Sequence, residues 1–194
     1  MSKKLLVLSD IHGNIPAIVA VLKWAADELT DSDMAVFLGD GLRELSYAQR
    51  QTGFPYEWKK VRGNNDGVSQ SDTTPTAPES EVFDFGGHRF YLCHGHHHAL
   101  YSGFGRLAAA ARKMSADAAF FGHIHTPWIE DVDGLLVVCP GSIARARSSA
   151  GETFAIIDCV PKRPLAVHFW GIDPNCNIRE LTINKGQIHS ETSL

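Results

Sequence analysis

The chain has 194 residues, of which 44% are hydrophobic and 21% are charged, as is usual for a water-soluble protein with one buried core. Its 18 Lys and Arg against 22 Asp and Glu give a net charge of −4, which disfavours nucleic acid as the main ligand because no overall positive field attracts a polyanion. We predict one globular domain over residues 1–194, in the cytoplasm, without a secretory leader or a membrane-spanning segment.

The four cysteines do not form a metal-binding or redox motif. Cys93, Cys139, Cys159 and Cys176 lie too far apart in the sequence for a Cys-x-x-Cys site. We expect them to pack as small hydrophobic residues in a reduced protein.

The chain begins with a predicted strand, loop and helix. Lys4–Ser9 is a nearly continuous apolar run, which is typical of a strand buried on both faces. Asn14 can cap a helix, and Pro16 suits the first turn of that helix. Helical spacing then relates four apolar residues, namely Ile18, Leu22, Ala25 and Leu29.

The next segment repeats this alternation. Met34–Asp40 is an apolar run that ends in an acid, Leu42–Gln51 predicts a short helix, and residues 56–61 predict a third strand. Ser69–Ser80 is rich in Ser, Thr and Pro and predicts a loop, too short to link two domains.

The rest of the chain is rich in predicted strands. Residues 81–93 alternate apolar and polar residues around Gly86-Gly87, which indicates a hairpin. Residues 104–114 predict a helix, and residues 118–123 predict a strand. Further strands are predicted over residues 128–133, 135–140, 153–159, 165–170 and 178–183. This order predicts an α/β fold in which two sheets pack face to face with helices outside.

Polar motifs follow five of the predicted strands. Ligands of such folds gather at the carboxyl ends of strands, so the five motifs can converge on one crevice. Residues two apart on an extended chain share a side, so Asp10 with His12, and His123 with His125, can both face inward. The motifs are Asp10-Ile11-His12-Gly13, Gly39-Asp40-Gly41, Gly63-Asn64-Asn65-Asp66, Cys93-His94-Gly95-His96 and Gly122-His123-Ile124-His125.

Each motif also has a purely structural interpretation. The aspartates could close turns or cap helices, the Asn pair could form an ordinary turn beside Gly63, and the histidines could be polar residues with hydrogen-bond partners. For each motif alone we favour that interpretation. The ordered set favours a functional site, because a chance occurrence of all five is hard to sustain.

The side chains in these motifs are those of a transition-metal site. Carboxylate, amide and imidazole together suit Mn, Fe, Co, Ni or Zn better than Ca or a thiolate-bound metal. Two Asp, one Asn and four His make seven candidate ligands, which is more than one such ion needs. Two ions that share a carboxylate would use all of them.

The order and spacing of the motifs, from Asp10 to about Ser142, resemble the calcineurin-like metallophosphoesterases, in particular their small bacterial and archaeal phosphodiesterases. The resemblance implies an α/β/β/α sandwich of two mixed β-sheets and two divalent ions, with manganese expected first and Ni, Co, Fe or Zn as alternatives. It implies that one ion is held by Asp10, His12, Asp40 and His125. It implies that the second is held by Asp40, Asn64, His94 and His123, so that Asp40 bridges the two.

Residues 92–101 contain four histidines, and the resemblance gives a ligand position to His94 alone. His96 lies two residues further on, where it could face the same site and contact a metal ligand or the substrate. It is our first candidate for the catalytic acid that protonates the leaving group, and water is the second. His97 and His98 have no motif role, and we expect them to be surface or capping residues.

Two residues are candidates for substrate binding. The protein-phosphatase branch of the family carries His where this chain has Asn65, which cannot donate a proton as a general acid, so we expect weak turnover of simple alkyl monoesters. Arg145, or its neighbour Arg147, could bind a phosphate, although a solvated basic turn is an equally good interpretation. Asp66 could orient a ligand or simply close its turn.

The expected chemistry is hydrolysis of a small phosphoester. Two divalent ions would lower the pKa of a bridging water and supply hydroxide for in-line attack on phosphorus. A phosphodiesterase is the leading hypothesis, and a phosphomonoesterase or nucleotide phosphatase is the nearest alternative. A non-catalytic protein-interaction platform on the same fold is the alternative from another class. The strand-rich C-terminal part could also support a homo-oligomer.

Overall fold

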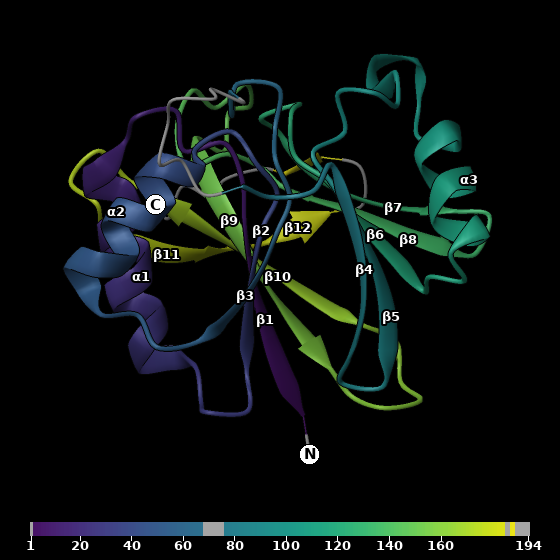
Figure 1. Ribbon diagram of the computed structural model, residues 1–194, viewed down its shortest axis with the longest axis horizontal. Coiled ribbons are helices and arrows are strands. Elements are labelled where there is room, and N and C mark those ends of the chain that lie inside the picture. The colour runs from purple at the N-terminus through teal and green to yellow at the C-terminus, as the bar shows by residue number, and fades with distance from the viewer. Residues whose placement is uncertain (1, 68–75, 185–186, 189–194) are drawn as a thin grey trace.

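The computed structural model describes residues 2–67, 76–184 and 187–188 and contains two large β-sheets (Figure 1). The first sheet has the strand order β11-β10-β9-β1-β2-β3, with β1, β2 and β3 parallel and β9 antiparallel to β1. Its strands are β1 (Lys3–Leu8), β2 (Met34–Phe37), β3 (Glu57–Lys60), β9 (Glu152–Cys159), β10 (Ala166–Ile172) and β11 (Ile178–Leu181).

The second sheet is also mixed and has the order β4-β5-β6-β8-β7. Strand β6 pairs in parallel with β5 and β8, and the two edge strands are antiparallel to their neighbours. Its strands are β4 (Ser80–Phe85), β5 (His88–Cys93), β6 (Ala118–Phe120), β7 (Pro127–Val132) and β8 (Leu135–Pro140).

Helices cover the outer faces of both sheets (Figure 1). Helices α1 (Ile15–Glu28) and α2 (Leu42–Thr52) lie on the first sheet, and α3 (Gly105–Lys113) lies on the second, just after a 3₁₀ turn, η1 (Leu100–Ser102). The predicted α/β/β/α sandwich of two mixed sheets is therefore confirmed. No helix in the described ranges is long and apolar enough to cross a membrane.

The alternation of side chains along β1 explains why its whole length is apolar. Leu5 and Val7 pack into the core between the two sheets, whereas Leu6 and Leu8 pack against α1. All four side chains are fully buried. The carboxyl end of this strand is thus held firmly beneath the loop that carries the first polar motif.

Local signals in the sequence match the turns that bound the elements. The Asn14 side chain accepts a hydrogen bond from the Ala17 backbone N–H at 3.3 Å, which caps α1 as predicted. Gly86 and Gly87, with φ of 57° and 83°, form the two-residue turn of the β4–β5 hairpin.

The structure differs from the prediction near the C-terminus. The strand predicted over residues 178–183 ends at Leu181, and a short ribbon of β12 (Ile183–Asn184) and β13 (Gln187–Ile188) follows it. Of the predicted loop at residues 69–80, residues 69–75 lie outside the described part, and β4 already begins at Ser80.

Candidate metal centre

Backbone hydrogen bonds join the loops that carry the polar motifs at the carboxyl ends of the central strands. The Asp10 N–H donates to the Gly39 carbonyl at 2.9 Å, which ties the loop after β1 to the loop after β2. The Gly122 N–H donates to the His94 carbonyl at 3.0 Å, which ties the loop after β6 to the end of β5. Motifs far apart in the sequence are therefore fixed side by side.

Two carboxylates and three imidazoles converge at this point. Asp10 Oδ1 lies 3.1 Å from His125 Nε2 and 3.5 Å from His12 Nε2. Asp40 Oδ2 lies 3.4 Å from His94 Nε2 and 3.6 Å from His12 Nε2. Within this cluster, two groups have ligand atoms close enough together to hold an ion, and they are Asp10 with His12 and His125, and Asp10 with Asp40 and His94.

Two atoms of the cluster are buried without a hydrogen-bond partner among the described residues, namely Asp10 Oδ1 and His94 Nε2. Asp10 and His94 are both 0% exposed. Leaving such polar atoms unsatisfied costs about 1–3 kcal/mol each. A divalent cation would satisfy both, so the residues fit a metal.

In two of the imidazoles, Nδ1 is hydrogen-bonded to a backbone carbonyl. His94 donates from Nδ1 to the Leu38 carbonyl at 2.7 Å, and His125 donates from Nδ1 to the Arg145 carbonyl at 2.9 Å. A carbonyl can only accept, so each Nδ1 carries the proton and each Nε2 keeps its lone pair for the cluster. Metal-binding histidines are commonly oriented in this way.

The carboxylates are also held in place. Asp10 Oδ2 accepts from Ser9 Oγ at 2.6 Å and from the His123 N–H at 3.0 Å, which leaves Oδ1 to face the imidazoles. Asp40 Oδ1 accepts from the Asn65 N–H at 2.7 Å, and Asp40 Oδ2 accepts from Asn65 Nδ2 at 2.5 Å. Each carboxylate therefore has one oxygen oriented by a backbone amide.

Five candidate ligands have a left-handed backbone, with φ between 41° and 70°, and they are Asp10, His12, Asp40, His123 and His125. This conformation is costly for residues other than Gly, by about 1–3 kcal/mol each, and it persists where the surrounding structure over-determines it. Strain concentrated in the polar motifs supports a functional role for them.

Close packing around Asp40 predicts the effect of a single methyl group. A Cβ at Gly63 would lie 2.0 Å from Asp40 Oδ1 and 2.6 Å from the Asp40 backbone nitrogen, whereas no described atom lies within 4 Å of a Cβ at Gly67. We expect Gly63→Ala to lower the free energy of unfolding by about 1–3 kcal/mol. Gly67→Ala, the control in the same loop, should stay within about 0.5 kcal/mol of the parent protein in urea titrations. Equal stability of the two variants would contradict this packing.

Electrostatics within the cluster favour charged carboxylates. Burial alone would raise the pKa of Asp10, but close polar contacts with His12 and His125 outweigh it and hold this pKa well below its usual value. Burial would likewise raise the pKa of Asp40, and the contact with His94 reverses the shift. Both carboxylates are therefore ionised at neutral pH.

The imidazoles respond to the same carboxylates. Burial would lower the pKa of His94, but the contact with Asp40 and the negative charges nearby raise this pKa. The pKa of His125 is raised against burial by its contact with Asp10. For His123, burial and the charge of His94 lower the pKa. The two carboxylates thus stabilise positive charge on His94 and His125.

The remaining predicted ligands lie around the cluster. The His123 ring is 5.2 Å from the His94 ring between centroids, so this side chain is adjacent to the buried group. Asn64 is exposed, and no hydrogen bond joins it to the cluster within the described ranges. Its neighbour Asn65 is the residue that contacts Asp40.

The predicted catalytic and substrate residues are placed less uniformly. The His96 ring lies 5.5 Å from the His94 ring, and its buried Nδ1 has no partner in the described structure. Burial, followed by the charges of neighbouring histidines, lowers the pKa of His96. His97 is exposed and lies 3.8 Å from Glu79. Arg145 has an exposed side chain, and its contribution to the cluster is the carbonyl that binds His125.

Sequence reasoning missed two residues beside the cluster. Ser9, which binds Asp10, ends an apolar run and carries no motif signal. Tyr101 lies with its ring 6.2 Å from the ring of His123 and accepts a 2.7 Å hydrogen bond from Arg147 Nη1. Ser9 is the sequence neighbour of Asp10, whereas only the fold brings Tyr101 to the site.

Comparison with known proteins identifies the family. Residues 4–162 match the calcineurin-like phosphoesterase superfamily domain. A probable metallophosphoesterase of Mycoplasma pneumoniae is 32% identical over 148 residues, which cover 75% of this chain and 82% of that protein. The phosphodiesterase YfcE of Escherichia coli is 28% identical over 172 residues, which cover 80% of this chain and 87% of that protein.

Solved structures of similar fold include a protein from a eukaryote. The crystal structure of Vps29 from Entamoeba histolytica, complexed with zinc, matches with a TM-score of 0.70 and 20% identity, over 91% of this chain and 98% of that one. At this identity the likeness concerns the fold alone. The family match covers most of the chain and includes all the polar motifs. The chain therefore belongs to the calcineurin-like phosphoesterase superfamily.

Proposed function

We propose that this phosphoesterase is a metal-dependent phosphodiesterase that hydrolyses a small phosphoester. The observation that carries the proposal is the pair of unpartnered buried atoms, Asp10 Oδ1 and His94 Nε2, within a cluster of carboxylates and imidazoles. The relatives named as metallophosphoesterases and phosphodiesterases support the reaction class.

The metal-binding residues that we propose form two sets. One ion would be held by Asp10, His12, Asp40 and His125, and the other by Asp40, Asn64, His94 and His123. Asp40 Oδ2 faces His12 from one set and His94 from the other, which supports its role as the bridge. When bound, two divalent ions, with manganese expected first, would supply Lewis-acid activation of the phosphoryl group and of water.

The chain's own residues orient the reactants. Ser9 and the His123 N–H fix one oxygen of Asp10, so the other oxygen stays directed at the site without reorganisation. We propose that Asn65 and Arg145 contact the substrate. Asn65 is exposed and hydrogen-bonded to Asp40, and Arg145 is an exposed residue two positions from Arg147.

The test of the proposal is hydrolysis of matched chromogenic phosphate mono- and diesters by metal-stripped protein after Mn, Ni, Co, Zn or Mg is added back. We expect no hydrolysis without metal and restored hydrolysis that favours the diester. Restored hydrolysis that favours the monoester would move the proposal to a phosphomonoesterase. No hydrolysis with any ion, despite metal binding, would favour the non-catalytic interaction platform.

We further propose that His96 donates a proton to the leaving group. His96→Ala should then slow diesters with alkyl leaving groups by about 10²-fold, within the range of general acid catalysis, and change 4-nitrophenyl esters little because their leaving group needs no proton. His97→Ala is the control, since His97 is the exposed neighbour. Equal rates of the two variants on the alkyl ester, measured at saturating metal, would remove His96 from this role.

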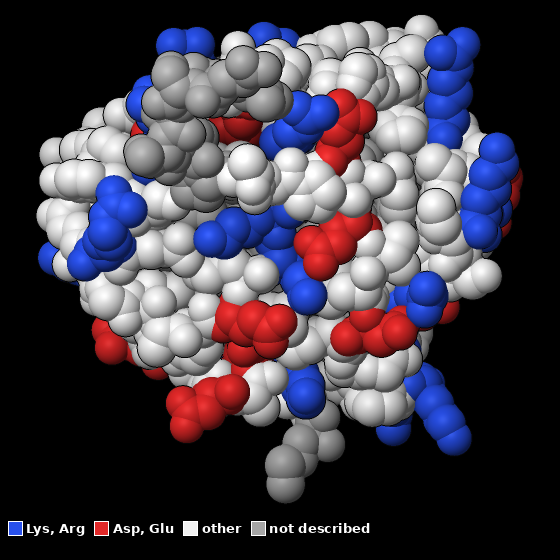
Figure 2. Space-filling model, in the orientation of Figure 1, with Lys and Arg blue, Asp and Glu red and all other residues white. Residues whose placement is uncertain are grey.

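Nucleic acid remains a poor candidate for the substrate. Lys and Arg are interspersed with Asp and Glu on the face drawn in Figure 2, without a continuous basic band there. We expect no binding to a random oligonucleotide at either low or high salt concentration. A small phosphoester makes no such demand for an extended positive surface.

A further inference from the structure

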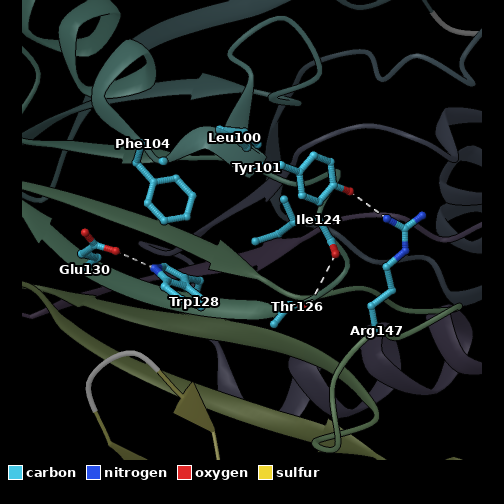
Figure 3. A pocket seen from close by; sticks show the side chains of 9 residues that line it. Leu100, Tyr101, Phe104, Ile124, Thr126, Trp128, Glu130 and Arg147 are labelled. Carbon is cyan, nitrogen blue, oxygen red and sulfur yellow. Dashed lines mark hydrogen bonds between the residues drawn. The ribbon is translucent and has the colours of Figure 1, made fainter.

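A cavity of about 560 Å³ opens beside the metal centre between η1, the start of α3 and the loop after β6 (Figure 3). This volume is within the range of about 300–1,000 Å³ that small-molecule sites occupy. Its main lining residues are Leu100, Tyr101, Phe104, Ile124, Trp128 and Arg147.

The cavity adjoins residues of the proposed metal site. Ile124, in its wall, lies in the sequence between His123 and His125. The Arg147 N–H donates to the His125 carbonyl at 2.9 Å, so the arginine is anchored to a candidate ligand. Tyr101, at the rim, lies with its ring 6.2 Å from the ring of His123. A molecule whose phosphate reached the metal centre could therefore extend directly into the cavity.

The inner walls are aromatic, and their polar atoms are already paired. Phe104 and Trp128 pack with ring centroids 5.6 Å apart, and Trp128 Nε1 donates to Glu130 Oε2 at 3.0 Å. Figure 3 shows these rings on one side of the cavity and the hydrogen-bonded pair of Tyr101 and Arg147 on the other. The site thus offers apolar ring faces at one end and a guanidinium with further N–H donors at the other.

We propose that this cavity binds an aromatic group of the phosphoester substrate, while Arg147 contacts its phosphate. Flat rings suit a wall of Phe and Trp because offset or edge-to-face packing adds to the burial of apolar surface. Guanidinium matches phosphate oxygens in pairs. The inference rests on the proposed function for the identity of the substrate. It names a specificity site that neither the polar motifs nor the relatives' names indicate.

The test compares ligands that share a headgroup and differ in the organic group. Affinities of phenylphosphonate and methylphosphonate, which are not hydrolysed, are measured by calorimetry with and without manganese. We expect phenylphosphonate to bind at least about tenfold more tightly, which equals about 1.4 kcal/mol. Adenosine monophosphate in parallel distinguishes a nucleobase from a simple aryl group, and a preference for either aromatic ligand supports the proposal. Equal affinities of all three ligands would overturn it.

Variants locate the binding to the cavity. Tyr101→Ala should reduce the ratio of the phenyl to the methyl affinity at least about threefold, and Arg147→Gln should weaken both ligands. Tyr47→Ala is the matched control, since Tyr47 and Tyr101 are both exposed tyrosines, at 51% and 72%, and Tyr47 lies on α2. Phenylphosphonate should also change tryptophan emission, and Trp128→Phe should abolish that change. An emission change that persists in Trp128→Phe would place the aromatic group elsewhere.

The outcome is separable from that of the proposed function. Metal-restored hydrolysis without any preference for an aromatic ligand would refute the cavity assignment and leave the phosphodiesterase standing. An aromatic preference in binding, without hydrolysis under any metal, would support the cavity assignment and refute the phosphodiesterase.

Discussion

Asp40→Asn should reduce metal-restored diester hydrolysis by at least about 10²- to 10³-fold, the loss expected when one main electrostatic stabiliser is removed from an active site. Asp40 Oδ2 faces imidazoles of both proposed ligand sets, His12 at 3.6 Å and His94 at 3.4 Å. An amide of the same shape keeps the packing but removes the charge. The measurement is the initial rate at saturating manganese, with metal content determined on the same sample.

The control for this variant is Asp84→Asn, since Asp84 is an exposed aspartate on β4 that pairs with Arg89. It should retain the parent rate and metal content. Unchanged hydrolysis in Asp40→Asn would contradict the bridging role of this carboxylate. Lost hydrolysis with full metal content would limit its role to catalysis.

Asp66→Ala should have the largest effect on stability among the residues of the polar motifs. Asp66 Oδ2 accepts from the backbone N–H groups of Asp40 and Gly63 at 2.7 and 2.9 Å. Oδ1 accepts from those of Gly41 and Leu42 at 2.8 and 2.9 Å, at the start of α2. The variant leaves four donors without this acceptor and removes a negative charge from a helix N-terminus.

The expected loss is about 3 kcal/mol, because unsatisfied donors cost about 1–3 kcal/mol and water can reach some of these four. Thermal unfolding should show a melting temperature lower by about 10 °C. Asp31→Ala, at an exposed turn, should change it little. Metal affinity should fall in Asp66→Ala alone, since the turn that carries Asp40 loses its support. A melting temperature equal to that of Asp31→Ala would show that Asp66 only closes its own turn.

Much of the fold could be predicted from local signals. The apolar run before Asp10, the Asn14 cap and the Gly86-Gly87 turn each act over a few residues, and each occurs in the structure as predicted. The ribbon of β12 and β13 was not predicted because its strands are only two residues long, too short for any alternation of polar and apolar residues.

The residue types of the candidate site could be predicted from the sequence, but their burial and contacts could not. Which histidine is buried depends on the fold: His94 is 0% exposed at the end of β5, whereas His97 lies on the surface three residues later. Ser9 contacts its own neighbour Asp10, but as the last residue of an apolar run it carried no signal of that role. The contact of Tyr101 with Arg147 joins loops that are distant in the sequence, so no local pattern could indicate it. The same holds for the aromatic cavity, whose walls come from three segments.

The most direct test of the central claim is anomalous X-ray scattering from crystals of the protein loaded with manganese. We predict two peaks about 3.5–4 Å apart, which is the usual spacing of paired catalytic ions. One should lie among Asp10, His12 and His125, and the other beside Asp40 and His94. A single peak, or none within reach of these residues, would contradict a two-metal centre.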